Sequence, residues 1–182
     1  LGGPEVGHPP ELYAEAFEFA RAAGLHRVPH AGELAGPASV WGALRALGAE
    51  RIGHGVRSVE DPALVDYLRE HQVPLELCPT SNVCLGVVPS YEAHPIRRLW
   101  DAGLTITVNS DDPPLFDTDL VREYTVLADH PSTSLRAGLG FTADELERLS
   151  LNALRASFLP ADEKARMEAE FKDEFARLRR ET

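Results

Sequence analysis

Residues 104–113 of this chain read LTITVNSDDP: a β-branched run, then an amide, a hydroxyl and two adjacent carboxyls before a proline. The apolar part alternates little, as expected for a strand buried on both faces of a sheet. Neighbouring carboxylates at the end of such a strand are costly unless a cation or hydrogen-bond donors compensate them. An acidic helix N-terminus ahead of the prolines would account for them equally well. The stretch predicts a buried strand that ends in polar residues.

Three other short apolar runs also end in polar clusters. The expected strands cover residues 26–29, 50–53, 74–77 and 104–108, and a helical pattern follows each one. Their clusters read PHAGE (29–33), RIGHG (51–55), CPTSN (78–82) and NSDDP (109–113). Such alternation indicates parallel strands with right-handed crossovers. A (β/α) barrel gathers the ends of its strands at one mouth, so the pattern predicts an α/β fold of this kind. Residues 1–3 fit the tail of a preceding strand.

Helices are expected at 11–23, from Pro37, from Pro62, from Pro95 and from Asp119. Residues 142–182 are expected to form the C-terminal helices. Thr142 and Glu145 make a capping box for the first of them, and the last begins at Pro160. The last helix carries an apolar stripe that favours a docking face (Met167, Phe171, Phe175 and Leu178). Residues 130–139 lack an apolar face and are interpreted as a loop insertion.

Composition limits the possible partners. The 182 residues suit one domain, taken here as 1–182, and the net charge of −11 argues against a nucleic-acid partner. No apolar run approaches the roughly 20 residues of a membrane span. Two cysteines without disulfide or C-x-x-C spacing indicate a reducing, cytoplasmic location. Lysines occur only at 164 and 172, which excludes Schiff-base chemistry near the clusters. The oligomeric state is left open.

The clusters contain residue types suited to hydrolysis at a metal. A neutral histidine such as His30 is a good zinc ligand, and Glu33 nearby is a possible proton donor or acceptor. Glycines on both sides of His54 let its ring approach a ligand, although a structural histidine is the alternative for that residue alone. Asp111 and Asp112 point different ways from a strand end, so one can bind metal while the other faces substrate. Together, these residues at one sheet edge favour an active site.

At these motifs the chain resembles the adenosine deaminase family of zinc-dependent (β/α) barrels in the amidohydrolase superfamily. The matching segments are HAGE (30–33), RIGHG (51–55), CP-x-SN (78–82), NSDDP (109–113), LGGPE (1–5) and NA-x-RASF (152–158). They cover nearly the whole chain and in combination are highly specific. The His-x-Glu and Pro-Cys-x-x-Cys signature of cytidine-type zinc deaminases is absent from the sequence.

The resemblance implies a role for each matched residue. His30 and Asp111 would bind zinc, Glu33 would protonate the purine at N1, and His54 would orient the zinc-bound water and help deprotonate it. Asp112 would hold the ring near N7, and the backbone amide of Gly3 would meet N3. The implied reaction converts adenosine or 2′-deoxyadenosine to inosine and ammonia. Glu33 must then carry a proton near pH 7, so its pKa is expected to be raised.

The chain departs from the family pattern in one important respect. The family's other two zinc ligands come from a His-x-His on the first barrel strand, and no two of the seven histidines here have that spacing. The chain resembles the tail of strand 4 through strand 8, with the C-terminal helices, and starting at Leu1 suggests that residues precede it. Two ligands hold zinc weakly, so the isolated chain is expected to be inactive.

Two kinds of alternative stay open. The alternative substrates are 6-aminodeoxyfutalosine, whose deaminases share the motif at 78–83, and adenine, although Gly53 is more typical of adenosine-type members. An alternative of another class is an inactive half-barrel that binds a nucleoside or a partner at its open edge.

Overall fold

The computed structural model describes residues 1–128 and 139–181. Its centre is a parallel sheet of four strands in the order β1-β2-β3-β4, so each strand lies beside its neighbour in sequence. The strands are β1 (His30–Ala31), β2 (Ile52–His54), β3 (Leu75–Leu77) and β4 (Ile106–Val108). The expected α/β class and parallel strands are therefore confirmed.

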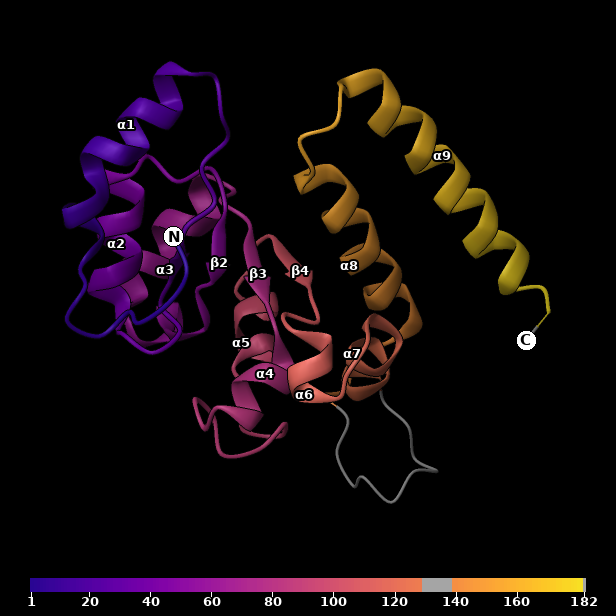
Figure 1. The fold of residues 1–182 in the computed structure, drawn as a ribbon. Helices are drawn as coiled ribbons and strands as arrows, with labels where there is room; N and C mark the ends of the chain where they lie inside the picture. The colour runs from indigo at the N-terminus through magenta and orange to yellow at the C-terminus, as the bar shows by residue number, and fades with distance from the viewer. Residues whose placement is uncertain (129–138, 182) are drawn as a thin grey trace.

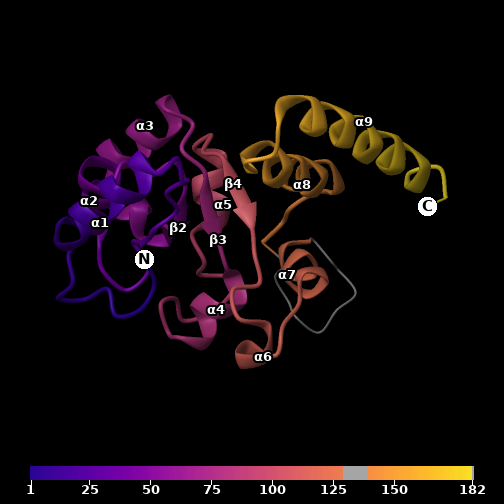
Figure 2. The ribbon, with the colours of Figure 1, turned by 45° about the horizontal axis from the view of Figure 1, so that its top comes forward.

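Helices connect and cover the strands (Figure 1). Those before β4 are η1 (Pro10–Tyr13), α1 (Ala14–Ala22), α2 (Pro37–Ala46), η2 (Val56–Glu60), α3 (Pro62–Glu70), α4 (Pro79–Cys84) and α5 (Ile96–Asp101). Those after it are α6 (Pro113–Phe116), α7 (Leu120–Leu127), α8 (Ala143–Ala156) and α9 (Ala161–Leu178). In both ribbon views α1, α2 and α3 gather beside β2, whereas α8 lies next to β4 and α9 lies outside α8 (Figure 2).

The core forms where the strands meet the helices. Leu75 and Ile106 are partners in the β3–β4 register and are fully buried, as are Leu64 and Leu68 on α3. At about 25 cal/mol per Å² of apolar surface, burying such side chains supplies most of the stabilisation of the sheet. The sheet therefore has a fixed position beneath the loops that follow its strands.

Local signals in the sequence set several helix ends. Asp61 accepts a hydrogen bond from the Ala63 amide at the start of α3, as its position before Pro62 predicts. Thr142 and Glu145 form the expected capping box of α8. The short helix α4 was not expected, whereas α6 is the helix of the acidic N-terminus alternative, and both begin at prolines inside the polar clusters. Proline suits the first turn of a helix because its missing N–H would have no partner there.

The first strand differs from its expected position. Residues 26–29 belong to no assigned element, and the strand is His30–Ala31. The Arg27 and Pro29 carbonyls still accept hydrogen bonds from Glu50 and Gly53. Pro29 has no N–H to donate, so the ladder there is incomplete and regular pairing begins one residue later. The Leu1 carbonyl accepts from the His30 amide at 2.9 Å, which places the N-terminal segment along the free edge of β1.

The loop insertion expected at 130–139 lies, except for its last residue, outside the described residues. The stripe on α9 packs toward α8, with Met167, Phe171 and Phe175 half-buried and Leu178 45% exposed. Within the described ranges, no helix is both long and apolar enough to cross a membrane.

Candidate active site

The candidate residues lie at the carboxyl ends of the strands. His30 opens β1, Glu33 follows in the next loop, and His54 ends β2. Asp111 comes shortly after β4. A cavity of about 460 Å³ opens at this edge of the sheet, and His30, His54, Cys78 and Asp111 line it. The sequence clusters therefore meet at one edge, as parallel strands require.

The two histidines form a contact pair. His54 Nε2 lies 3.2 Å from His30 Nδ1, and the rings meet edge to face. A side chain at Gly53 would clash, because a Cβ atom there would lie 2.7 Å from His30 Cδ2. The glycine before His54 therefore lets the His30 ring lie against the neighbouring strand.

His54 is held in an uncharged form. Its side chain is buried and its backbone adopts the left-handed region at φ 66°, which is unusual for a residue other than glycine. Burial, followed by the nearby His30, lowers the pKa of His54, although Asp111 and Glu5 act in the opposite direction. A neutral imidazole has one nitrogen that accepts a proton, so His54 is suited to act as a base.

Glu33 holds its proton to a higher pH than an ordinary surface carboxyl does. Burial, together with the charges of Asp111 and Glu5, raises the pKa of Glu33 to about 7. Its Oε1 atom lies 3.5 Å from His54 Nδ1, and both atoms are buried without a hydrogen-bond partner among the described residues. Buried polar atoms without partners are rare in native structures. They leave this side of the site ready for a polar ligand.

Asp111 joins the same group from the far strand. Its backbone also adopts the left-handed region, and its Oδ2 atom accepts a hydrogen bond of 2.7 Å from the Ser81 hydroxyl. Ligand atoms of His54, Cys78 and Asp111 lie within 4.8 Å of one another. Burial and, to a smaller extent, the surrounding negative charges raise the pKa of the Cys78 thiol. The sulfur is therefore protonated without a metal.

The two expected substrate contacts lie at the margin. Gly3 lines a second cavity of about 180 Å³, together with His30 and Glu33, and has φ 113°. Asp112 is exposed at the start of α6, where its carbonyl accepts from the Leu115 and Phe116 amides. Asp112 is the N-cap residue of α6, so the acidic helix N-terminus is present, but the Asp112 carboxylate makes no cap bond to that helix.

Two further polar residues of the site had no role assigned from the sequence. Ser81 holds Asp111, and Glu5 accepts hydrogen bonds from the loop that carries Glu33. Both belong to motifs that the resemblance covers, and that membership was the available signal. Their partners are 30 and 28 residues away in sequence, so only the fold identifies the contacts.

The donors present fit a zinc ion. Imidazole nitrogens, a carboxylate and a cysteine sulfur are the atoms that zinc prefers. They converge at one cavity, beside buried polar atoms without partners. Zinc sites are usually four-coordinate, and the expected pair of His30 and Asp111 supplies two ligands.

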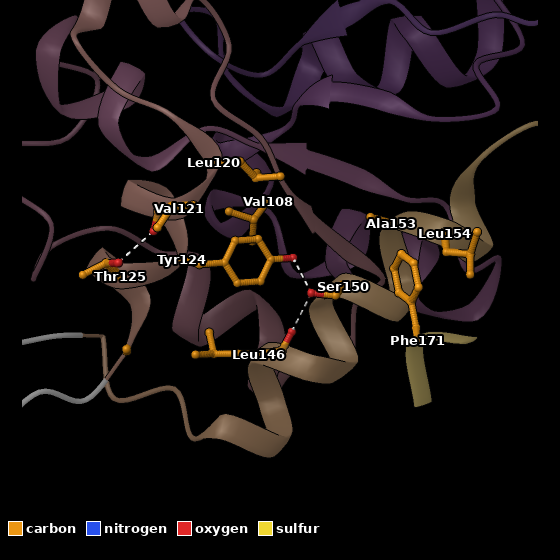
Figure 3. A pocket seen from close by; sticks show the side chains of 11 residues that line it. Val108, Leu120, Val121, Tyr124, Thr125, Leu146, Ser150, Ala153, Leu154 and Phe171 are labelled. Carbon is orange, nitrogen blue, oxygen red and sulfur yellow. Dashed lines mark hydrogen bonds between the residues drawn. The ribbon is translucent and has the colours of Figure 1, made fainter. Parts of the chain in front are cut away.

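A larger cavity of about 640 Å³ lies between α7, α8 and α9 (Figure 3). Most of its lining is apolar, and its hydroxyl groups are already paired: Ser150 Oγ with Tyr124 and with the Leu146 carbonyl, and Thr125 with the Val121 carbonyl. No titratable cluster faces it among the described residues. The catalytic chemistry is therefore assigned to the smaller, polar cavity.

Comparisons with known proteins agree with the motifs. The adenosine deaminase family model matches residues 1–174. An aminodeoxyfutalosine deaminase from Streptomyces avermitilis is 48% identical over 93% of this chain and 45% of its own. An adenosine deaminase from Klebsiella pneumoniae is 45% identical over 91% of this chain and 47% of its own. The chain thus spans about half the length of these curated relatives.

Solved structures give the same result for the fold. The adenine deaminase of Arthrobacter aurescens superposes with a TM-score of 0.89 at 36% identity, over 95% of this chain and 50% of its own. A zinc-bound amidohydrolase from Burkholderia ambifaria gives a TM-score of 0.86 at 30% identity, over 97% of this chain and 48% of its own. The chain thus matches about half of each of these structures, and the expected partial barrel is confirmed. The chain belongs to the adenosine deaminase family.

Proposed function

We propose that the protein carrying these residues is a zinc-dependent deaminase of a 6-aminopurine nucleoside, with adenosine or 2′-deoxyadenosine as substrate. The observation that carries the proposal is the pairing of two buried, unpartnered atoms, Glu33 Oε1 and His54 Nδ1, beside the His30 and Asp111 donors. One group of this pair has a raised pKa and the other a lowered pKa. Groups whose environments move their pKa values apart are suited to be an acid and a base.

His30 and Asp111 would hold the zinc ion, with further ligands from outside the chain described here. When bound, zinc lowers the pKa of a coordinated water to about 7, which makes hydroxide available at neutral pH. The zinc-bound Burkholderia relative supports a metal in this family. Ligand atoms of Cys78 and Asp111 lie within 4.8 Å of each other, but the family resemblance assigns Cys78 no ligand role.

Each proposed site residue of this chain then has its own role in the reaction. Glu33 protonates the purine at N1, which makes C6 electrophilic. His54 orients the attacking water and accepts its proton. Asp112 holds the ring near N7, and the Gly3 amide meets N3. Water adds at C6, and the proton that His54 takes from it passes to the amino group, which leaves as ammonia. The hydroxyl proton of the adduct returns to Glu33, and a 6-oxopurine protonated at N1 remains.

A second candidate substrate is 6-aminodeoxyfutalosine, processed by the same residues. It is favoured by the Streptomyces relative, which is 48% identical against 45% for the Klebsiella adenosine deaminase. A difference this small does not separate the substrates. Adenine is a weaker candidate, because Gly53 before His54 is the adenosine-type residue even though an adenine deaminase has the same fold.

The isolated chain is proposed to be inactive, since it supplies only part of the metal site and leaves a sheet edge without a strand. The competing proposal from another class is a half-barrel that binds a nucleoside or a partner without catalysis. That reading gains support if the coding sequence upstream of Leu1 lacks a strand with His-x-His.

The deciding experiment measures ammonia release by the full-length protein with adenosine, 2′-deoxyadenosine, 6-aminodeoxyfutalosine and adenine, at equal zinc loading. We expect one nucleoside to be preferred by at least tenfold in kcat/KM. The isolated chain serves as the comparison, and we expect it to hold far less than one zinc per chain. Nucleoside binding by calorimetry without ammonia release from any substrate would favour the non-catalytic reading.

A further inference from the structure

Glu5 makes an unusual set of contacts for a side chain near the start of the chain. Its carboxylate accepts hydrogen bonds from four consecutive backbone amides, those of residues 32–35. The bonds from Glu33, Leu34 and Ala35 measure 3.1, 2.7 and 2.8 Å, and all three reach the same oxygen, Oε2. Gly32 bonds to the other oxygen. Few side chains can satisfy four amides at once.

These amides belong to the loop between β1 and α2, which has no ladder partner on that side. Unpaired backbone N–H groups are costly when they are buried. On its other side the loop is held by Arg57, whose amide and guanidinium donate to the Gly32 and Leu34 carbonyls at 2.9 and 2.8 Å. The loop is thus fixed from two directions, and Glu5 supplies the acceptors for all four amides.

The contacts also favour an ionised Glu5. Burial raises the pKa of Glu5, but hydrogen bonds from the Ser39 hydroxyl and from the amides of Ala35, Gly32 and Leu34 lower it by more. The net effect is a lowered pKa. A charged acceptor makes stronger hydrogen bonds than a neutral one. The hydrogen bonds from the amides of residues 32–35 to Glu5, called the Glu5 clamp below, are therefore strongest when Glu5 is ionised, as it is at neutral pH.

We propose that Glu5 is a positioning residue that sets the place of the Glu33 side chain opposite His54. The Glu33 amide donates one of the four hydrogen bonds to Glu5, so the Glu33 backbone is fixed at the point where its side chain leaves the loop. Its Oε1 atom then lies 3.5 Å from His54 Nδ1. The same clamp ties residues 1–5 to this loop, and Gly3 and Glu33 line the same cavity. The catalytic part of this inference rests on the proposed deaminase function.

The alternative is that Glu5 only anchors the loop, without effect on the reaction. The two readings differ in which kinetic constant changes. A displacement of about 1 Å at a reacting group costs on the order of 100-fold in rate. A plain anchor would lower the unfolding midpoint and leave the rate per folded molecule unchanged.

The first arm of the test needs no activity. Amide hydrogen exchange is measured for residues 32–35 in the unchanged full-length protein and in its Glu5→Ala, Glu5→Gln and control Glu18→Gln variants. Glu18 is an exposed residue of α1 whose carboxylate pairs with Arg21 of the same helix. We expect exchange to rise by about tenfold or more in Glu5→Ala, less in Glu5→Gln, which keeps one acceptor oxygen, and not in the control. Unchanged exchange in Glu5→Ala would overturn the clamp.

The second arm measures kcat and KM for the preferred nucleoside in the full-length protein with the same substitutions. We expect kcat to fall about 100-fold in Glu5→Ala, with KM within about threefold, and Glu5→Gln to recover part of the loss. Faster exchange with an unchanged kcat would reduce Glu5 to an anchor and overturn the positioning role. If the unchanged protein releases no ammonia, the proposed function fails, and the exchange arm alone decides whether Glu5 holds the loop.

Discussion

The four strands and the last helix contrast sharply. Each strand has only two or three residues, yet every residue of β2 and β4 is buried. Helix α9 has 18 residues, and none of them is buried. Strands β2 and β3 each have a strand on both sides and β4 contacts α8, whereas the main contacts of α9 within the described residues are with α8 (Figure 2). Length and a clear apolar stripe are therefore poor measures of how much an element stabilises the fold.

The two regions also differ in the kind of interaction that holds them. Packing of apolar side chains holds the sheet region. Helix α9 is joined to α8 largely by exposed ion pairs, such as Arg155 with Glu168 and Arg179 with Glu147. Exposed pairs contribute about 0–1 kcal/mol each and weaken with salt. Because all proposed catalytic residues lie at the sheet, substitutions in the two regions should have separable effects.

The largest effect is expected for Glu33→Gln in the full-length protein. A positioned general acid contributes about 10²–10⁴-fold, so kcat/KM should fall by that range. The raised pKa of about 7 means that Glu33 is protonated below pH 7 and loses its proton as the pH rises. Activity of the unchanged enzyme should therefore decline above pH 7, and Glu33→Gln should lack that decline. The measurement is a pH–rate profile of both proteins.

The matched control for that experiment is Glu168→Gln on α9, which removes a carboxylate of an exposed ion pair. It should keep the rate and the shape of the profile. A pH–rate profile of Glu33→Gln that coincides with that of the parent would remove Glu33 from the acid role.

The next largest effect compares two leucines. Leu68 on α3 is fully buried, and Leu178 on α9 is 45% exposed. Leu68→Ala should lower the free energy of unfolding by about 3 kcal/mol, because it leaves a cavity in the core. Leu178→Ala should cost below about 1 kcal/mol, since less surface is buried there. Urea unfolding of both variants gives the values, and equal losses would show that α9 is as tightly packed as the sheet.

The sequence predicted the sheet region well because short-range signals agree there. Apolar runs, prolines at helix starts and the Thr142 capping box each act over a few residues, and the structure contains the corresponding strands and helices. The first strand was misplaced because Pro29 interrupts its ladder. Helix α4 has only six residues, too few for an apolar periodicity to predict it.

The site was predictable to the level of motifs and no further. The strand ends gave His30, His54 and Asp111, and the parallel fold brings them to one edge. The hydrogen bonds between Glu5 and the loop at 32–35, and between Ser81 and Asp111, join residues that are 27–30 positions apart. They depend on three-dimensional packing and have no local sequence signal. The catalytic roles assigned to these residues stay predictions until the kinetics are measured.

A third, smaller difference is expected between two glycines with similar backbones. Gly32, in the site loop, has φ 70° and Gly24, after α1, has φ 75°. A Cβ atom at Gly32 would collide with Val40 Cγ2, whereas one at Gly24 would meet nothing within 4 Å. Gly24→Ala should therefore cost only the strain of the left-handed backbone, about 1 kcal/mol. Gly32→Ala should cost about 2 kcal/mol or more in thermal unfolding, since packing adds to the strain. Equal costs would mean that Val40 can move aside.

The smallest effect concerns the ion pair that joins α5 to α8. Glu145 accepts hydrogen bonds from Arg97 and Trp100, and hydrogen bonding by Arg97, partly offset by burial, lowers the pKa of Glu145 to about 2. A carboxyl with a lowered folded pKa stabilises the fold above its unfolded pKa, near 4.5. This contribution is lost as the pH falls from there toward 2. Glu145→Gln should therefore be less stable than the parent at pH 7, and the difference should narrow by pH 3. The measurement is the thermal midpoint of both proteins at the two pH values. A difference that stays constant would mean that the residue acts through the Thr142 capping box, which glutamine preserves only in part, and not through its charge.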